Sequence, residues 1–295
     1  MTAGRGAGTV FHAMAILSVQ SWVAAGHVGN SAALFPLQRL GFETWAVPTW
    51  VGSNHPGHPR WHGGAMPADR VAGMLAALVD RGLLARCRAV LTGYVGDPAI
   101  GEAIERAVAA ARPAGALYSC DPVIGDRAEG IYVAAGIPAL FRERLVPAAD
   151  IVTPNQFELE WLVGRALPTM ADIAAGAGEL RRSGRGGTVL VTSVEAGGDP
   201  ARQRMLAVGP DGAWLVEHPT VPVRVKGTGD LVAALFLAGL LRTGALPAAL
   251  AYAASAIHGV LESTRRAGGD ELALVAAQDE IVAPARWFAA EPVRP

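Results

Sequence analysis

Residues 226–241 read KGTGDLVAALFLAGLL, and this stretch carries the strongest signal in the 295-residue chain. Gly227 and Gly229 allow a tight turn, and the apolar run after them predicts a buried helix that begins beside Asp230. At such a helix N-terminus, exposed backbone N–H groups and the helix dipole favour a bound anion. The stretch therefore predicts a phosphate-binding turn with a carboxylate on the first turn of a buried helix.

Upstream of this turn, short apolar segments alternate with amphipathic ones. The expected strands are residues 13–20, 44–47, 89–92, 116–120, 151–153 and 188–192. The expected helices between them are residues 30–40, 69–81, 99–111 and 171–182. This alternation predicts βαβ crossovers and a mostly parallel, buried sheet of the α/β class.

The C-terminal part of the chain adds a hairpin and three helices. Two short strands, 205–208 and 214–217, flank the turn-forming sequence Gly209-Pro210-Asp211-Gly212, which predicts an antiparallel hairpin at the sheet edge. The expected helices are residues 230–241, 247–263 and 271–278.

The organisation of the chain favours one domain. No repeat, low-complexity linker or shift in composition divides it, so we expect a single domain over residues 13–295, preceded by a disordered leader at 1–12. The stretch from Val51 to Met66 holds three histidines and two prolines between periodic segments. It is expected to be a long loop or flap, and such loops are more often functional than idle.

Composition excludes several classes of function. The 25 basic and 26 acidic residues are scattered, so no footprint for nucleic acid or for an anionic membrane is seen, and a small-molecule partner is expected. Cys87 and Cys120 lack a CxxC spacing, which argues against a disulfide framework or a thiolate zinc site and fits a reducing cytoplasm. The apolar run 231–241 is about half the ~20 residues that a bilayer needs, and no export signal is recognised.

Acidic side chains follow the expected strand 116–120, at the edge where parallel sheets bind ligands. Asp121 and Asp126 could hold Mg²⁺ directly or through water, because this ion takes few protein oxygens and keeps several waters. The alternative is an ordinary capped turn.

Two more strand ends carry polar residues. Asn155 and Glu158 would share a helix face that points to the same sheet edge, although this spacing is more often a capping box than a metal site. Thr192 and Ser193 offer hydroxyls that could bind phosphate, with a Ser/Thr turn as the alternative.

Together these positions favour phosphoryl transfer. Asp230 would lie beside a bound phosphate and could take the proton of an attacking hydroxyl, whereas the alternative is that it only caps the helix. The chain has no GxxxxGK[ST], no early GxGxxG and no GxSxG motif. The histidines His55, His58 and His62 have a spacing compatible with a metal, but no nearby cysteine or carboxylate completes the set.

Seven segments in this order and spacing resemble the pyridoxal kinases of the ribokinase superfamily over about residues 13–278. They are VQS at 19–21 with GHVGNS at 26–31, SNH at 53–55, TGY at 92–94, DPVIGD at 121–126, TPNQFELE at 153–160, VTS at 191–193 and KGTGDL at 226–231. The resemblance implies a three-layer αβα fold and ATP-dependent phosphorylation of the 5′-hydroxymethyl group of pyridoxal, and of pyridoxine and pyridoxamine. It also implies Mg²⁺, room for a monovalent cation such as K⁺, and a homodimer.

Site roles also follow from the resemblance. Asp230 would be the catalytic base, and the amides of Gly227, Thr228 and Gly229 the anion hole. The residues implied near the vitamer are Ser21, Ser53, His55 and Tyr94. Those implied near the metal are Asp121, Asp126 and Glu158. Those implied near ATP are Asp121, Thr153, Glu158, Thr192, Ser193, His218, Pro219, Thr220, Val221 and Lys226 with the anion hole.

The flap departs from the resemblance at Pro56-Gly57-His58-Pro59, and Trp22 and Trp50 lie close to the expected substrate positions. These indoles could narrow the pocket or pack in the core. Two other functions stay open: a sibling kinase that acts on hydroxymethylpyrimidine through the same aspartate, and a vitamer-binding carrier without catalysis. The glycines and the aspartate at 227–230 argue against the carrier, since binding alone needs no base beside an anion hole.

Overall fold

The structure is a computed structural model that describes residues 15–293, so the leader expected at 1–12 lies outside the described residues. One ten-stranded sheet runs through the molecule in the order β12-β11-β10-β9-β8-β5-β4-β1-β2-β3. Its strands are β1 (Ala15–Val23), β2 (Glu43–Gly52), β3 (Gly63–Ala65), β4 (Cys87–Thr92), β5 (Leu117–Cys120), β8 (Ile151–Val152), β9 (Thr188–Val191), β10 (Arg202–Gly209), β11 (Gly212–Pro219) and β12 (Glu291–Pro292). A separate small hairpin is formed by β6 (Gly125–Asp126) and β7 (Gly130–Ile131).

The direction of the strands confirms the predicted sheet. The six strands from β2 to β9 pair in parallel, and β3, β10, β11 and β12 are antiparallel to their neighbours. The predicted hairpin is β10–β11, and its turn is the predicted Gly-Pro-Asp-Gly sequence between Gly209 and Gly212. β12 pairs outside this hairpin, so the hairpin lies near the sheet edge but does not form it.

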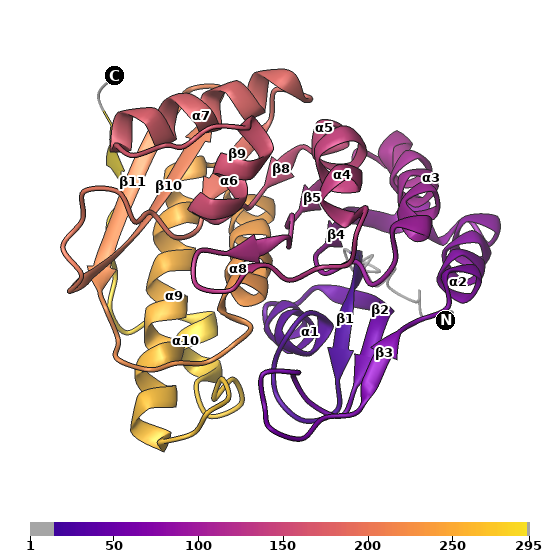
Figure 1. Cartoon of the computed structure of the whole chain (residues 1–295), viewed down its shortest axis with the longest axis horizontal. Coiled ribbons are helices and arrows are strands. Elements are labelled where there is room, and N and C mark those ends of the chain that lie inside the picture. The colour runs from indigo at the N-terminus through magenta and orange to yellow at the C-terminus, as the bar shows by residue number, and fades with distance from the viewer. Residues whose placement is uncertain (1–14, 294–295) are drawn as a thin grey trace, which may run out of the picture.

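Helices cover both faces of the sheet, which gives the three layers expected for an αβα fold (Figure 1). The helices on one face are α1 (Asn30–Arg39), α8 (Thr228–Thr243), α9 (Leu246–Ala267) and α10 (Gln278–Val282). Those on the other are α2 (Ala68–Asp80), α3 (Gly101–Ala111), α4 (Ile137–Leu140), α5 (Val146–Ala148), α6 (Gln156–Val163) and α7 (Met170–Ser183). None of the helices within residues 15–293 is long and apolar enough to cross a membrane.

Helix α8 is buried on all sides, as its apolar sequence predicts. Every residue from Leu231 to Gly239 is buried, and the helix packs against α1 and α9. Fully burying a side chain such as Leu235 or Phe236 contributes roughly 1.5–3 kcal/mol each. The first turn of α8 is therefore held in a fixed place relative to the sheet.

The prediction of a helix at residues 271–278 is wrong. In the structure this stretch is irregular, and α10 begins only at Gln278. Leu272 and Leu274 are both fully buried, and residues two apart point to different sides of a helix, so an extended path serves this burial better. The loop expected at 51–66 is confirmed in its middle, but β2 enters it and β3 lies inside it.

The carboxyl ends of the parallel strands meet at one edge of the sheet. Strand β1 lies between β2 and β4, so the chain moves first to one side of β1 and then to the other. In open α/β sheets, ligands bind where the strand order reverses in this way. The segments that follow β1, β4, β5, β8 and β9 at this edge contain most of the predicted site residues.

Candidate active site

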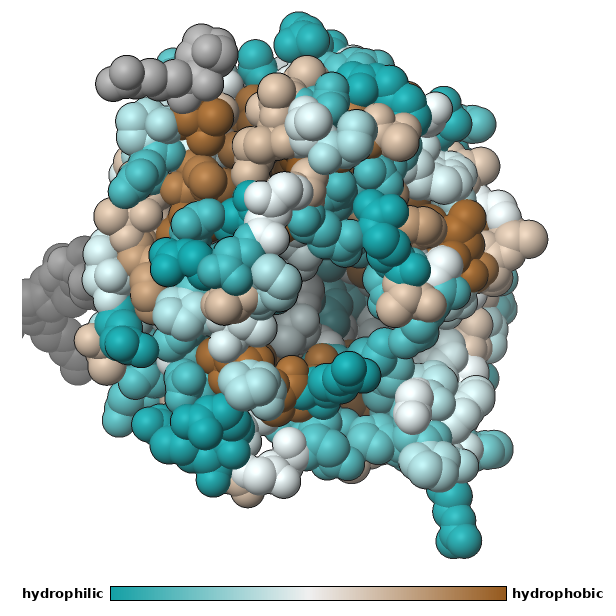
Figure 2. All heavy atoms as spheres, turned by 60° about the vertical axis from the view of Figure 1, so that its left-hand side comes forward, coloured by the Kyte–Doolittle hydropathy of each residue, from teal (hydrophilic) through white to brown (hydrophobic). Residues whose placement is uncertain are grey.

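The face of the molecule that carries the β10–β11 side is hollowed near its centre, and mostly hydrophilic residues surround the opening (Figure 2).

The N-terminus of α8 has free donors. Gly227 precedes the helix in the left-handed region, with φ 83°, and no side chain caps the helix. A Cβ on Gly227 would lie 1.8 Å from the carbonyl oxygen of His27, so this turn is pressed against the loop that follows β1. A Cβ on Gly229 would meet nothing within 4 Å, and the first backbone N–H groups of α8 are therefore open to an anion.

Asp230 is the third residue of α8 and lies against the same loop. Burial raises the pKa of its carboxyl group, and hydrogen bonds from the backbone N–H groups of Gly29 and of Asp230 itself oppose this shift. Gly29 in turn touches Ser21, because a Cβ on Gly29 would lie 2.3 Å from the Ser21 Oγ. The structure thus brings Ser21, the 26–29 loop and Asp230 together.

A second group of buried residues faces Asp230 from the ends of β5 and β8. The Thr153 hydroxyl donates to Asp121 Oδ1 at 2.9 Å, and both residues are buried. Burial raises the pKa of Asp121 well above its usual range, and the nearby charges of Glu158 and Asp230 raise it further. The charges of Asp121, Glu158 and Asp230 therefore act on one another at this edge of the sheet.

Glu158 lies at the start of α6 and has two roles there. Its Oε2 accepts from the Asn155 N–H at 2.9 Å in a capping box, which confirms the structural interpretation of this spacing. Its Oε1 accepts from the Ile124 N–H at 2.9 Å, which ties α6 to the segment after β5. Burial raises the pKa of Glu158 to about 7, against the effect of these N–H donors.

The donor set fits a divalent cation. Two buried carboxylates whose pKa values are raised by burial, Asp121 and Glu158, would gain from a positive charge between them. Within the described residues, no three His, Cys, Asp or Glu side chains are grouped so as to hold a metal ion. Asp126 Oδ1 accepts from the Ala128 and Glu129 N–H groups at 2.9 and 2.7 Å, so one of its oxygens serves the turn between β6 and β7.

The β6–β7 hairpin brings two residues that the sequence analysis did not single out. Tyr132 follows β7 with 46% of the residue exposed, and partial desolvation of its hydroxyl raises the pKa, with the charges of Glu158 and Asp230 adding to the shift. Glu129 Oε1 accepts a charged hydrogen bond from Lys226 Nζ at 2.5 Å. The hairpin therefore reaches from the acidic group to the turn before α8; only its position after a strand end gave any sign of this in the sequence.

The flap faces this turn as well. A Cβ on Gly57 would lie 4.0 Å from the Lys226 Cε, and His55 Nδ1 accepts from the Gly57 N–H at 2.9 Å. The pKa of His55 is lowered mainly by burial and next by the charge of Lys226. Ser53 is engaged inside the flap, where its Oγ donates to Asn54 Oδ1 at 2.6 Å and accepts from the His62 N–H at 2.9 Å.

The positions predicted for the vitamer ring and for ATP differ in their surroundings. Tyr94 is half-buried, and its carbonyl accepts from the Thr49 hydroxyl at 2.5 Å. Thr192 and Ser193 follow β9 at the carboxyl edge and are partly exposed. The Thr220 hydroxyl donates to the Pro200 carbonyl at 2.8 Å, while Pro219 is exposed and Val221 buried.

The His218 side chain is directed into the protein. Its ring lies 5.4 Å from that of His258 and 5.7 Å from that of Phe288, measured between centroids. Burial lowers the pKa of His218 to about 4, so the ring is neutral. His218 thus supports the segment at 218–221 from the protein interior, while Pro219 reaches the surface.

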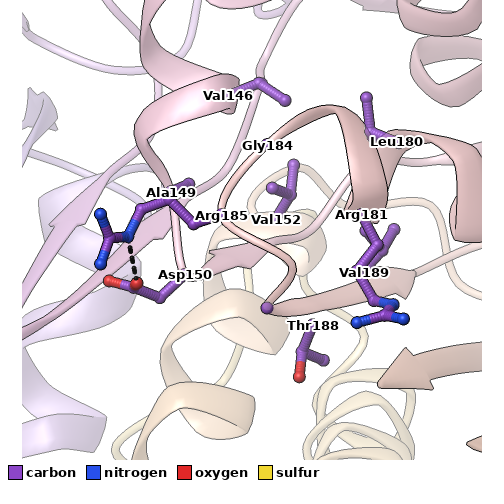
Figure 3. A pocket seen from close by; sticks show the side chains of 11 residues that line it. Val146, Ala149, Asp150, Val152, Leu180, Arg181, Gly184, Arg185, Thr188 and Val189 are labelled. Atoms are coloured by element: carbon purple, nitrogen blue, oxygen red, sulfur yellow. Dashed lines mark hydrogen bonds and ion pairs between the residues drawn. The ribbon is translucent and has the colours of Figure 1, made fainter. Parts of the chain in front are cut away.

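A cavity at the opposite edge of the sheet is structural. It has a volume of about 10 Å³, no more than one water, and lies among α5, α7 and the amino ends of β8 and β9 (Figure 3). Asp150 beside it accepts from Arg185 Nε at 2.9 Å and from Arg112 Nη1 at 3.1 Å. This ion cluster ties three segments together far from Asp230.

Comparison with known proteins identifies relatives of the chain. The model of the phosphomethylpyrimidine kinase family matches residues 64–273. The pyridoxal kinase PdxY of Rubrobacter xylanophilus is 51% identical over 283 residues, with 95% of this chain and 96% of the relative covered. That of Granulibacter bethesdensis is 48% identical, with 94% and 99% covered.

Solved structures show the same likeness. The pyridoxal kinase of Leishmania donovani, in complex with ADP and pyridoxamine, is 29% identical, with a TM-score of 0.87 and coverage of 95% of this chain and 99% of that chain. The pyridoxal kinase of Trypanosoma brucei is 28% identical, with a TM-score of 0.83 and the same coverage.

Proposed function

The chain belongs to the pyridoxal kinases of the phosphomethylpyrimidine kinase family, and from this membership we propose that Asp230 and the N-terminus of α8 phosphorylate vitamin B6 at the expense of ATP. The substrate is the 5′-hydroxymethyl group of pyridoxal, with pyridoxine and pyridoxamine as further substrates, and the product is the 5′-phosphate. One observation carries the proposal: the Asp230 carboxylate lies on the first turn of a helix whose N-cap residue, Gly227, supplies no side-chain cap.

The chemistry follows from this placement. The 5′-hydroxyl oxygen attacks the γ-phosphorus of ATP, the bond to the β-phosphate oxygen breaks, and ADP leaves. Asp230 takes the hydroxyl proton, which requires its ionised form. The amides at Gly227, Thr228 and Gly229 stabilise the negative charge on the transferred phosphoryl group, because their dipoles are fixed before the reaction.

We assign the metal to the acidic group. Asp121 and Glu158 would hold Mg²⁺, with Asp126 close by, and the ion would neutralise charge on the phosphates of ATP. Thr153 keeps Asp121 oriented through its hydroxyl and would also lie beside a monovalent cation such as K⁺. The proposal is supported by the raised pKa values of both carboxyl groups, which a cation would lower again.

The vitamer and the nucleotide would occupy opposite sides of Asp230. Ser21 would bind the pyridine ring, with Tyr94, Ser53 and His55 near the substrate. The residues proposed along ATP are Thr192, Ser193, Pro219, Thr220, Val221 and Lys226, with His218 supporting them from the protein interior. Lys226 would exchange its contact with Glu129 for the phosphates.

A substrate panel tests the function. We expect the purified protein with Mg²⁺ to release ADP in the presence of pyridoxal and to form its 5′-phosphate. Turnover on hydroxymethylpyrimidine alone would assign the chain to the sibling kinase activity instead. Binding of pyridoxal without turnover would support the carrier function instead.

The extent of the domain, the oligomeric state and the location of the protein are further parts of the proposal. We propose a single kinase domain over residues 13–295, which the undivided sheet supports, and a homodimer in the cytoplasm. Light scattering of the purified protein would measure the mass of the assembly, and a monomer would contradict the dimer.

A further inference from the structure

We propose that Glu271 is a positioning residue that fastens the flap, through His58, to the loop of residues 26–29 against which Asp230 lies. The inference rests on the proposed function, because the flap and the loop are assigned to the substrate side of the kinase site. It gives a role to the irregular segment after α9, where the sequence predicted a helix.

The side chain of Glu271 joins two segments that are far apart in the sequence. Its Oε2 accepts from the backbone N–H of His27 at 3.1 Å. Its Oε1 lies 2.8 Å from His58 Nε2, on the flap. Both side chains of this hydrogen-bonded pair are mostly shielded, with 25% of Glu271 and 29% of His58 exposed. A hydrogen bond to a carboxylate with this shielding is worth more than one on an open surface.

The loop that Glu271 contacts also contacts the proposed base, Asp230. Glu271 lies so close to Gly26 that a Cβ there would be 2.6 Å from its carboxylate. The same loop contacts Gly227 through the His27 carbonyl and contacts the Asp230 carboxylate through the Gly29 N–H. Glu271 therefore contacts one side of the loop, and the anion hole and the base lie on the other side.

The flap side leads to the same place. The flap approaches Lys226 at Gly57, next to the anion hole, and His58 is the neighbouring residue. If the pair with Glu271 holds His58, it holds the flap over the site in which the vitamer reacts. Asp270 also approaches His58, at 3.7 Å, but its side chain is 83% exposed, so it offers a matched control that should matter little.

The first test separates binding from turnover. We expect Glu271→Ala to raise the KM for pyridoxal about tenfold and to lower kcat about tenfold, since both the flap contact and the loop acceptor are lost. His58→Ala should raise the KM about fivefold and leave kcat within about twofold. Glu271→Gln should recover most of the kcat, because its amide oxygen still accepts from the His27 N–H. Asp270→Asn should stay within about twofold of the unchanged protein in both constants.

The second test does not depend on activity. Arg60 lies exposed in the flap, so brief trypsin treatment followed by mass spectrometry measures how often the bond after Arg60 opens to the protease. We expect cleavage there to be about fivefold faster in His58→Ala and in Glu271→Ala, and no faster in the double variant than in Glu271→Ala.

Two results would overturn the proposal: unchanged cleavage and unchanged KM in His58→Ala, or equal effects in Asp270→Asn and Glu271→Ala. A protein that does not phosphorylate pyridoxal at all would refute the proposed function. The cleavage experiment would still decide whether Glu271 holds the flap.

Discussion

Replacing Gly227 with alanine should lower both stability and activity, because the turn before α8 needs a positive φ at this residue and a close approach to the 26–29 loop. The residue has φ 83°, and a Cβ would lie 1.8 Å from the His27 carbonyl oxygen. Gly229, two residues later, is the matched control, because it has no positive φ and its Cβ would meet nothing within 4 Å.

The magnitude follows from these two values. A residue other than glycine in the left-handed region costs roughly 1–2 kcal/mol, and forcing extra atoms into a packed site costs a further ~1–3 kcal/mol. Gly227→Ala should therefore lower the free energy of unfolding by about 2–5 kcal/mol. Gly229→Ala should leave it unchanged or raise it by up to about 1 kcal/mol, because alanine favours a helix.

Activity should fall further than stability alone explains. The clash is relieved only if the turn moves away from the 26–29 loop, and this movement carries Asp230 away from the Gly29 N–H. A displacement of ~1 Å at a reacting group can cost about 10²-fold in rate. We therefore expect the kcat of Gly227→Ala to fall about a hundredfold at a temperature where the protein is still folded.

Urea unfolding followed by circular dichroism gives the stabilities, and ADP release with pyridoxal gives kcat. The unfolding midpoint of Gly229→Ala shows whether any substitution in this turn is harmful. An unfolding midpoint and a kcat equal to those of the unchanged protein in Gly227→Ala would refute the close approach of the turn and the loop.

Three further predictions concern single carboxylates. Asp230→Asn should lower kcat by ~10²–10⁴ and leave the KM for ATP within about twofold of that of the unchanged protein, as steady-state kinetics would measure. A variant that keeps a tenth of the activity would show that Asp230 is not the base. Since the pKa of Glu158 is about 7, a proton competes with the metal below that pH, and the Mg²⁺ concentration for half-maximal activity should be about tenfold higher at pH 6 than at pH 8. Glu158→Gln should raise the Mg²⁺ requirement and remove this pH dependence, so a persisting tenfold change would point to another group. Asp150→Ala should lower the free energy of unfolding by about 2 kcal/mol, because Arg112 and Arg185 lose their acceptor, and urea titration should show this without a change in KM.

The raised pKa of Glu158 also determines whether the protein becomes more or less stable as pH rises. In the folded protein this carboxyl group holds its proton to about pH 7, whereas in the unfolded chain it releases the proton near its ordinary pKa of 4.5. The folded state thus binds more protons between these values, so without a bound metal this group makes the protein less stable as pH rises from about 4.5 to 7.

Local patterns in the sequence predicted the central part of the fold well. Alternating apolar segments identified the parallel strands, and the Gly-Pro-Asp-Gly turn identified the β10–β11 hairpin. Each of these signals lies within a few residues. The pairing of β12 with β11 joins residues far apart in the chain, and two residues carry too little pattern to reveal it.

The site was predicted where a motif coincides with a strand end. Asp121, Glu158 and Asp230 come together as expected because parallel strands end at one edge and α8 begins there. Tyr132 and Glu271 were missed, since each lies in an irregular segment and reaches the site only through the folding of distant parts. The roles of the predicted residues in catalysis and binding remain predictions for the experiments above.

Both edges of the sheet end in very short strands, and this bears on how the molecule behaves at high concentration. β12 has two residues and ends in Pro292, which has no N–H to offer, and β3 at the far edge has three. Long unpaired edges recruit strands from other molecules and lead to aggregation. β3 pairs with only Trp50–Gly52 of β2, and β12 with only Trp214 and Leu215 of β11, so the two short strands block extension of the sheet over these residues alone.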